Sequence, residues 1–258
     1  RAILAQCGMY ATWDDHEITN DDGLYSLPEE ERRVAIEAWF EHVAIPRIDE
    51  DRFWDSYRWG DSLEIFVLDS RGERQPETRN TDAAVYLSRR QMDWFKGALS
   101  ASKAHFKIVL NSVPMSAWPT AMVVAEHDRW EGYKAQRDEV LDHILGEEIE
   151  NVWFLSGDYH CGAVARLERE GPRRRIWEIL TGPGGNYGNP FAYLVQVAET
   201  EASRERLLPP GQFEFLDPGM SATLLTFDPI ANTVHIEFID PEDGSYRYSA
   251  TLNQDGPI

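Results

Sequence analysis

Short apolar segments, each followed by polar residues, constrain this chain more than any other feature of its sequence. Purely apolar runs reach only four or five residues, as at residues 65–68, and that length is too short for a transmembrane helix. These runs alternate with segments in which apolar residues recur at helical spacing. Such alternation is typical of layered α/β architectures.

The first half of the chain is predicted to alternate strands and helices, and the second half to be mostly β. Ser88 and Gln91 form a capping-box pattern at the start of one helix. The other predicted helices cover residues 29–45 and 132–145, and the strands cover residues 9–13, 63–68, 106–110 and 151–155. Beyond residue 155 the apolar pattern takes a period of two. We therefore expect a hairpin of residues 163–168 and 175–180, then an antiparallel meander of residues 222–227, 234–239 and 246–252.

Composition bounds the class of protein. The chain has 258 residues, of which 42% are hydrophobic and 12% aromatic, so it can bury a sizeable core and is unlike a disordered chain. No repeat or flexible linker divides it, which favours one domain. The net charge is −20, which argues against a nucleic-acid binder that relies on phosphate neutralisation. Two cysteines, Cys7 and Cys161, exclude a disulfide-dense scaffold.

Polar residues follow each of the four strands predicted in the first half. Ligands of open α/β sheets bind beyond the carboxyl ends of the strands, so these residues should meet at one edge. Their carboxylate, amide and imidazole groups are ligands for hard and borderline cations. Two such cations would hold a phosphate and acidify a bridging water molecule. The four polar segments are Asp14-Asp15-His16-Glu17, Asp69-Ser70-Arg71, Asn111-Ser112 and Gly157-Asp158-Tyr159-His160.

Each polar segment also has a structural interpretation. An Asp after a strand is commonly a turn residue or a helix cap. Asp14 and Asp15 are harder to explain in that way, because adjacent carboxylates repel unless a cation or an Arg relieves them. Residues two apart at a strand end point to the same side, so Asp158 and His160 are expected to reach one ion. Arg71 either binds a substrate phosphate through two hydrogen bonds or pairs with a nearby carboxylate.

Five motifs in this order resemble the alkaline phosphatase D (PhoD-like) family of metallophosphoesterases. The resemblance extends from about Met9 to about Gly185, and the ordered set carries it rather than any single motif. The motifs are Trp13-Asp14-Asp15-His16-Glu17-Ile18-x-Asn20, Leu68-Asp69-Ser70-Arg71, Gln91-x-x-Trp94-Phe95, Trp130-x-Gly132-Tyr133-x-x-x-Arg137 and Phe154-Leu155-Ser156-Gly157-Asp158-x-His160.

The resemblance implies a four-layer α/β/β/α sandwich that hydrolyses small phosphomonoesters or phosphodiesters with a metal-activated water molecule. Some members of the family use iron together with calcium, and a periplasmic or secreted location is expected on the same ground. Two alternatives stay open. One is a phospholipase D-like hydrolase of the same family, and the other is a non-catalytic domain that binds cations or phosphate.

The resemblance also assigns roles to residues. Asp14 or Asp15 stands where the superfamily places a metal-binding Asn, and His16 stands at the His that contacts phosphate and helps the leaving oxygen. Asn111 occupies a position that often holds a metal-binding His. Asp158 and His160 match a Gly-His-x-His block, with His160 on the iron side. Asn20 belongs to the first motif but needs only to hold its loop.

One departure from the family pattern concerns the start of the chain. A Gly-Asp-x-x-Tyr segment normally precedes the Asp-His-Glu motif, but only twelve residues precede Trp13 and they lack it. The first β-α-β portion of the sandwich is therefore expected to be missing. We interpret residues 1–258 as a single metallophosphoesterase catalytic domain that forms the C-terminal part of a larger chain.

Overall fold

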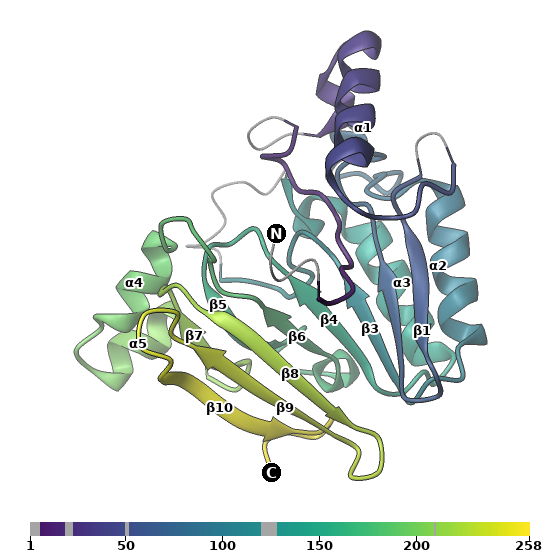
Figure 1. The fold of residues 1–258 in the computed structure, drawn as a ribbon. Coiled ribbons are helices and arrows are strands. Elements are labelled where there is room, and N and C mark those ends of the chain that lie inside the picture. Colours follow the sequence, from purple (N-terminus) through teal and green to yellow (C-terminus); the bar gives the residue numbers. More distant parts are fainter. Residues whose placement is uncertain (1–5, 19–22, 50–51, 120–127, 209) are drawn as a thin grey trace.

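A seven-stranded sheet forms the centre of the computed structural model, which describes residues 6–18, 23–49, 52–119, 128–208 and 210–258. The strand order is β1-β2-β3-β4-β6-β5-β7 (Figure 1). Strands β2, β3, β4 and β6 are parallel, whereas β1 runs antiparallel to β2, and β5 runs antiparallel to both β6 and β7. The seven strands are β1 (Asp55–Trp59), β2 (Leu63–Val67), β3 (Phe106–Leu110), β4 (Val152–Ser156), β5 (Gly162–Arg166), β6 (Trp177–Leu180) and β7 (Phe213–Asp217).

Helices cover one face of this sheet. The apolar stripe of α2 (Arg89–Ala101) packs with α3 (Lys134–Gly146) over β2, β3 and β4, and this core includes Phe95, Leu141 and Phe154. At the other end of the same face, α4 (Pro190–Gln196) covers β5 and β7. The remaining helices are α1 (Glu29–His42) and α5 (Glu201–Leu207), with single 3-10 turns at Leu24–Ser26, Pro76–Thr78, Trp130–Tyr133 and Pro172–Arg175. No helix in the described part of the chain is long and apolar enough to cross a membrane.

A three-stranded antiparallel sheet covers the opposite face. It consists of β8 (Ala222–Asp228), β9 (Thr233–Ile239) and β10 (Tyr246–Leu252), in the order β10-β9-β8. Ile236 and Phe238 of β9 pack against Trp153 and Trp177 of the large sheet. The α/β class, the two facing sheets and the final meander are thus confirmed. The described elements supply three of the four expected layers, since no described helix covers the outer face of the meander in Figure 1.

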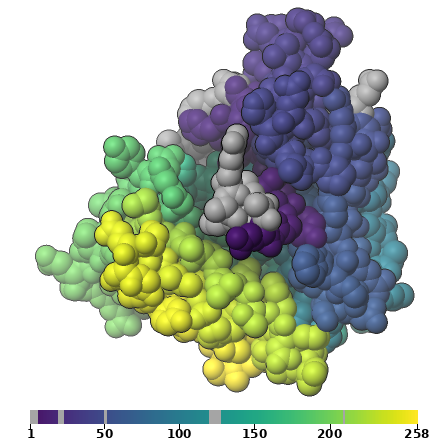
Figure 2. Space-filling model, viewed as in Figure 1, coloured from purple at the N-terminus to yellow at the C-terminus, as the bar shows by residue number. Residues whose placement is uncertain are grey.

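The predicted strand at residues 9–13 is wrong, because this segment has no ladder partner. Side chains hold it in place instead. The Thr12 hydroxyl donates to the Leu68 carbonyl at 2.6 Å, and Trp59 Nε1 donates to the Tyr10 hydroxyl at 2.7 Å. In Figure 2 this first described segment, in purple, lies in the angle between the yellow-green meander and the blue elements. Its position brings Asp14 and Asp15 to the large sheet without any strand pairing.

The first turn of α2, which Ser88 caps, also contacts the edge of the large sheet. Ser88 accepts the predicted hydrogen bond from Gln91 N. The Gln91 amide, however, does not return to Ser88. Its Oε1 accepts from Asp69 N at 2.9 Å and its Nε2 donates to Asp69 O at 3.0 Å. The side chain that was expected to complete a capping box therefore anchors the turn that follows β2.

Candidate active site

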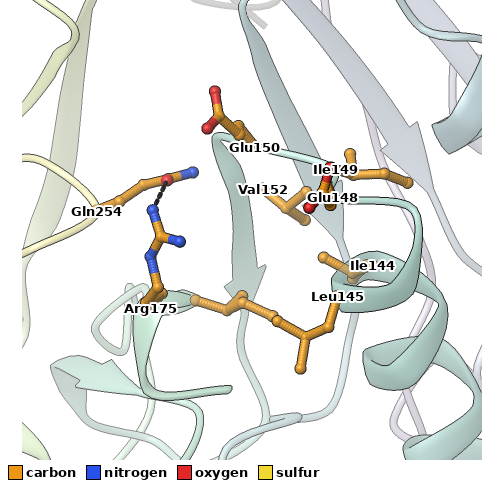
Figure 3. Close-up of a pocket in the computed structure, with 9 residues that line it drawn as sticks. Ile144, Leu145, Glu148, Ile149, Glu150, Val152, Arg175 and Gln254 are labelled. Carbon is orange, nitrogen blue, oxygen red and sulfur yellow. Dashed lines mark hydrogen bonds between the residues drawn. The ribbon is translucent and has the colours of Figure 1, made fainter. Parts of the chain in front are cut away.

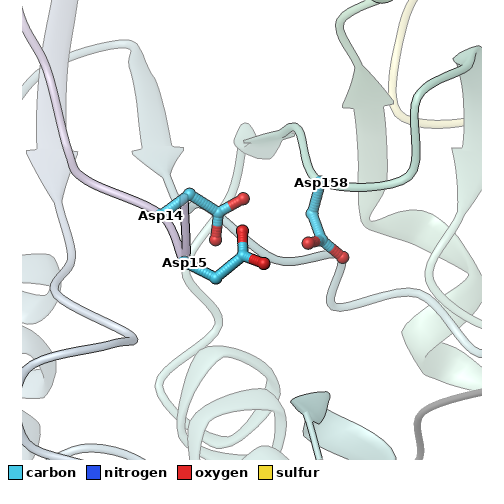
Figure 4. Close-up of side chains that lie close together, drawn as sticks. All are labelled: Asp14, Asp15 and Asp158. Atoms are coloured by element: carbon cyan, nitrogen blue, oxygen red, sulfur yellow. The ribbon is translucent and has the colours of Figure 1, made fainter. Parts of the chain in front are cut away.

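Three carboxylates converge beyond the carboxyl end of the large sheet. Asp14 and Asp15 come from the first described segment and Asp158 from the turn after β4 (Figure 4). One ligand oxygen from each lies within 4.8 Å of the other two. Because β2, β3 and β4 are parallel, the polar turns that follow them open at the same edge. This grouping is the geometry expected of a cation site.

The turn that carries Asp14 and Asp15 is held by its own hydrogen bonds. Asp14 N donates to Glu17 Oε2 at 2.7 Å, and Ile18 N donates to Asp15 O at 2.7 Å. The preceding Trp13 is buried, and its Nε1 donates to Asp69 Oδ1 at 2.7 Å. The indole therefore links this turn to the end of β2, which places the two carboxylates over the sheet edge.

Arg71 lies fully buried at the centre of these acidic groups. Its Nε donates to Asp14 Oδ1 at 2.6 Å, one Nη donates to Asp158 Oδ1 at 3.1 Å, and the other donates to Asp128 Oδ1. Asp15 Oδ1 lies 3.8 Å away. Of the two interpretations of Arg71, the structure shows pairing with carboxylates. Asp69, the carboxylate nearest to Arg71 in sequence, accepts from the Arg71 backbone N–H, at 3.0 Å, rather than from its guanidinium.

Asp128 is a site residue that the sequence did not reveal. It is buried, and its Oδ1 accepts from both Arg71 and Arg74. Its carbonyl oxygen accepts from Arg74 at 2.7 Å and from the buried Tyr86 hydroxyl at 3.3 Å. No motif marks Asp128, and only its contacts with the arginines identify it. Burial raises the pKa of Tyr86, so its hydroxyl stays protonated and donates.

The acidic groups outnumber the cations around them. Among the described residues, four carboxylates (Asp14, Asp15, Asp128 and Asp158) surround two guanidinium groups (Arg71 and Arg74). Burial, followed by repulsion from Asp14, raises the pKa of Asp158 well above its usual range despite the attraction of Arg71. Burial also raises the pKa of Asp14. An added cation would relieve this repulsion and lower both pKa values.

Asn111 supplies a fourth oxygen at the same edge. Its Nδ2 donates to the Val113 carbonyl, whereas its Oδ1 is buried and accepts no hydrogen bond from the described residues. A buried acceptor without a partner is unfavourable by about 1–3 kcal/mol, and it suggests an ion or water molecule. The amide oxygen therefore fits a hard cation, which takes carboxylate and carbonyl oxygens alike.

His160 differs from the sequence-based expectation. β4 ends at Ser156, so Asp158 and His160 lie in a turn rather than on a strand, and both have positive φ, 65° and 49°. The alternation that was expected to point them to one side does not apply. His160 Nε2 lies 3.2 Å from Asn186 Nδ2, and His160 is outside the carboxylate group. Its role as a metal ligand stays a prediction. Left-handed backbone at two non-glycine residues is uncommon and is concentrated at functional sites.

His16 lies at the solvent side of the carboxylates. Its side chain is 63% exposed, and its Nε2 is 3.9 Å from Asp15 Oδ2. An exposed imidazole beside the acidic group is placed where it can reach a bound substrate. Its catalytic role stays a prediction. Asn20, the other polar residue of that motif, lies outside the described residues.

Two pockets formed by described residues lie elsewhere on the surface, and candidate site residues line neither of them. A cavity of about 430 Å³ lies at the opposite end of β4, between Arg175 and Gln254 on one side and Glu148 on the other (Figure 3). Another, of about 1030 Å³, is lined by α1 and by Arg47 and Arg90. The carboxylate group is the stronger candidate because it combines buried charge, convergent ligands and an unpartnered acceptor.

Asp69 should make stability depend on pH. Burial, partly opposed by the hydrogen bond from Trp13, raises its pKa to about 6. A raised folded-state pKa stabilises the fold below the unfolded pKa of ~3.9, and this contribution is lost as pH rises through about 6. A shift of this size corresponds to ~3 kcal/mol. Asp69→Asn keeps the acceptor for Trp13 but cannot titrate. Between pH 4 and 7 the unfolding free energy of the wild type should therefore fall by ~2–3 kcal/mol more than that of the variant.

Urea unfolding at several pH values measures this dependence. Asp61→Asn is the control, because Asp61 pairs with Arg58 in an exposed position at the other end of the sheet. Parallel pH profiles for the wild type and Asp69→Asn would contradict the assignment of the raised pKa to Asp69.

Comparison with known proteins agrees with the fold. The sequence profile of the PhoD-like phosphatase family matches residues 1–213. Alkaline phosphatase D of Bacillus subtilis (strain 168) is 27% identical over 196 residues, covering 65% of this chain and 33% of that protein. A solved structure of PhoD superposes with a TM-score of 0.72 at 20% identity, covering 95% of this chain.

The match to the solved structure supports the fold, and the profile match extends over most of the chain. This chain spans 53% of the solved PhoD chain and about a third of the Bacillus protein. The profile match takes in the first motif with Asp14 and Asp15 as well as the turn with Asp158. The chain belongs to the PhoD-like phosphatase family.

Proposed function

We propose that this chain carries a metal-dependent site that hydrolyses phosphomonoesters or phosphodiesters. The observation that carries the proposal is the convergence of Asp14, Asp15 and Asp158 within 4.8 Å. The unpartnered Oδ1 of Asn111 and the excess of carboxylates over guanidinium groups support it. The name of the Bacillus relative, alkaline phosphatase D, supports the choice of substrate class.

The residues fit a hard cation. Asp14, Asp15, Asp158 and Asn111 would hold calcium, which prefers six to eight oxygen ligands. We propose iron as a second metal on the family resemblance, with His160 as its ligand. Bound cations would supply the positive charge that opposes the charge developing on phosphate oxygens, and would acidify a water molecule.

The chain's own residues divide the remaining work. His16, exposed beside Asp15, would donate a proton to the leaving oxygen. Arg71 has no exposed surface and already bonds three carboxylates. It therefore orients the ligand carboxylates and balances their charge, a role that we propose in place of direct phosphate binding.

Removing one ligand carboxylate tests the proposal. Asp158→Asn preserves the shape of the side chain but removes one negative charge from a group of carboxylates that repel one another. Without metal, we expect the variant to be as stable as the wild type or more stable. With calcium at a concentration 100 times the dissociation constant, the wild type should gain about 2.7 kcal/mol in unfolding free energy. The variant should lose most of that gain, together with hydrolysis of a chromogenic phosphodiester.

Asp228→Asn is the matched control, because Asp228 caps the β8–β9 turn through Ile230 N and Ala231 N, both at 2.9 Å. In this variant the increase in unfolding free energy on adding calcium and the turnover should both match the wild type. A calcium gain that also survives in Asp158→Asn would refute the ligand assignment. Calcium binding without turnover would favour a non-catalytic cation-binding domain, and turnover of phosphatidylcholine alone would favour the phospholipase D-like alternative.

The surroundings of the enzyme are proposals as well. Small phosphoesters are the expected partners, and the net charge of −20 disfavours nucleic acid as a ligand. We propose that residues 1–258 act as one catalytic domain and that the protein is periplasmic or secreted, in both cases on the family resemblance. Assaying culture fractions of the source organism for the protein tests the location.

A further inference from the structure

A fully buried glutamate, Glu178, lies behind the candidate site. It occupies the second position of β6 and faces the helical layer, whereas its neighbours Trp177 and Ile179 face the meander. Its Oε1 accepts from Met115 N at 2.8 Å and from the Ser156 hydroxyl at 2.6 Å. Its Oε2 accepts from Ser116 N at 2.8 Å and from the Ser116 hydroxyl.

The donors to Glu178 come from the turn that carries Asn111 and from the end of β4, next to the turn that carries Asp158. Met115 and Ser116 lie in the turn that begins with Asn111 after β3. Ser156 is the last residue of β4 and precedes the turn with Asp158. The two turns also touch directly, since Gly157 N donates to Ser112 O at 2.9 Å. Glu178 is thus a common acceptor for both.

The contacts of Glu178 are unusual for a carboxylate in a core. All four donors are neutral, and no Lys, Arg or His pairs with it among the described residues. A buried carboxylate is unfavourable unless hydrogen bonds replace its hydration. A hydrophobic residue would pack this position of β6 without that requirement. The carboxylate, in contrast, holds two backbone N–H groups and one hydroxyl of the loop after β3, together with the Ser156 hydroxyl at the end of β4.

We propose that Glu178 is a positioning residue for the metal site, because it fixes the turn with Asn111 relative to the turn with Asp158 and so sets the spacing of the ligand oxygens. The predicted effect on metal affinity rests on the proposed function. The prediction that both turns become more mobile when Glu178 is changed does not require a metal.

Hydrogen exchange of the chain without metal tests the positioning directly. In Glu178→Gln an amide NH₂ must face one of the two backbone N–H donors, so at least one tether breaks. We expect amides in residues 111–117 and 156–161 to exchange at least ~5-fold faster, the factor that matches a ~1 kcal/mol hydrogen bond. Amides at the opposite end of the sheet should be unchanged. An even rise over the whole sheet would make Glu178 a general stability residue and overturn the proposal.

Two further variants sharpen the result. Ser156→Ala removes only the tether to the Asp158 turn, so residues 156–161 should loosen while residues 113–117 do not, and this variant decides the matter if Glu178→Gln does not fold. Lys107→Met is the control. Lys107 is also buried, but it donates to the Ala104 carbonyl at 2.8 Å at the start of β3, away from the site. Lys107→Met should leave exchange at both turns unchanged.

Calcium titration then separates this proposal from the proposed function. Loss of a hydrogen bond that orients metal ligands typically weakens metal binding by about 10–100-fold, and we expect that loss for Glu178→Gln but not for Lys107→Met. Loosened turns with unchanged calcium affinity would overturn the proposal. A wild-type chain that binds no calcium would refute the proposed function instead, and the exchange pattern would still decide whether Glu178 fixes the two turns.

Discussion

Replacing Arg71 with Met is expected to lower the free energy of unfolding by about 3–5 kcal/mol in calcium-free buffer, because the change leaves a buried group of like charges without its cation. Arg71 has no exposed surface and contacts Asp14, Asp128 and Asp158. Met preserves most of the side-chain volume, so the loss reports charge rather than packing. Urea unfolding by tryptophan fluorescence measures the effect.

Calcium should restore more stability to Arg71→Met than it adds to the wild type, since a cation takes over the balance of charge. Arg166→Met is the matched control. Arg166 is 2% exposed, but its guanidinium donates to carbonyl oxygens, including Asp255 O at 2.7 Å, and stacks over Trp177 at 4.0 Å. This control should lose stability without any calcium rescue. Equal responses of both variants to calcium would show that Arg71 does not balance a cation site.

The same reasoning gives a pH dependence for Arg71→Met. Without the guanidinium, the folded-state pKa values of Asp14 and Asp158, already raised by burial, should rise further. Protonation then stabilises the folded variant below the unfolded pKa of ~3.9, and that contribution disappears as pH rises through the folded values. The difference in stability between the variant and the wild type should therefore shrink as the pH is lowered.

The sequence contained enough information for the central layers. Leu63–Val67, Phe106–Leu110 and Val152–Ser156 are short, mostly apolar segments of the length typical of buried strands. The period of two predicted the meander correctly. β1 was missed because Asp55–Trp59 is largely polar, buries none of its residues, and pairs only at the edge of the sheet. The prediction of a strand at residues 9–13 was wrong although the local pattern suits a strand. A strand also needs a neighbouring strand to pair with, and the local sequence carries no information about that neighbour.

The site could be predicted in part for the same physical reasons. Asp158 was expected near Asp14 and Asp15, and the structure brings all three together. The expected reason holds for Asp158, which follows β4, but side-chain contacts rather than a strand place Asp14 and Asp15. The partners of Arg71 were not predictable, because Asp128 is 57 residues away in the chain and follows no motif. The positions of Asp158 and His160 depend on two left-handed residues, and periodicity carries no information about such turns.

Replacing the exposed histidine of the first motif, His16, should affect catalysis without affecting the fold or metal binding. His16 lies 3.9 Å from Asp15, with 63% of its side chain exposed, so removing it should disturb neither the core nor the carboxylate group. As the acid that protonates the leaving oxygen, it should contribute about 10²–10⁴-fold to turnover of an alkyl phosphoester. We expect His16→Ala to lose that factor while its calcium-induced stabilisation stays unchanged.

The leaving group decides between an acid and other roles for His16. A nitrophenolate leaves with little protonation, so His16→Ala should lose much less turnover on nitrophenyl esters than on alkyl esters. His42→Ala is the control, because His42 is also exposed and, within the described part of the chain, bonds only the Ala38 carbonyl of α1, at 2.8 Å. This variant should match the wild type on both substrates. Equal losses for His16→Ala on both esters would make His16 a residue that orients substrate or ligands. A loss of calcium binding would instead place its imidazole among the metal ligands, in contact with the cation rather than with the leaving oxygen.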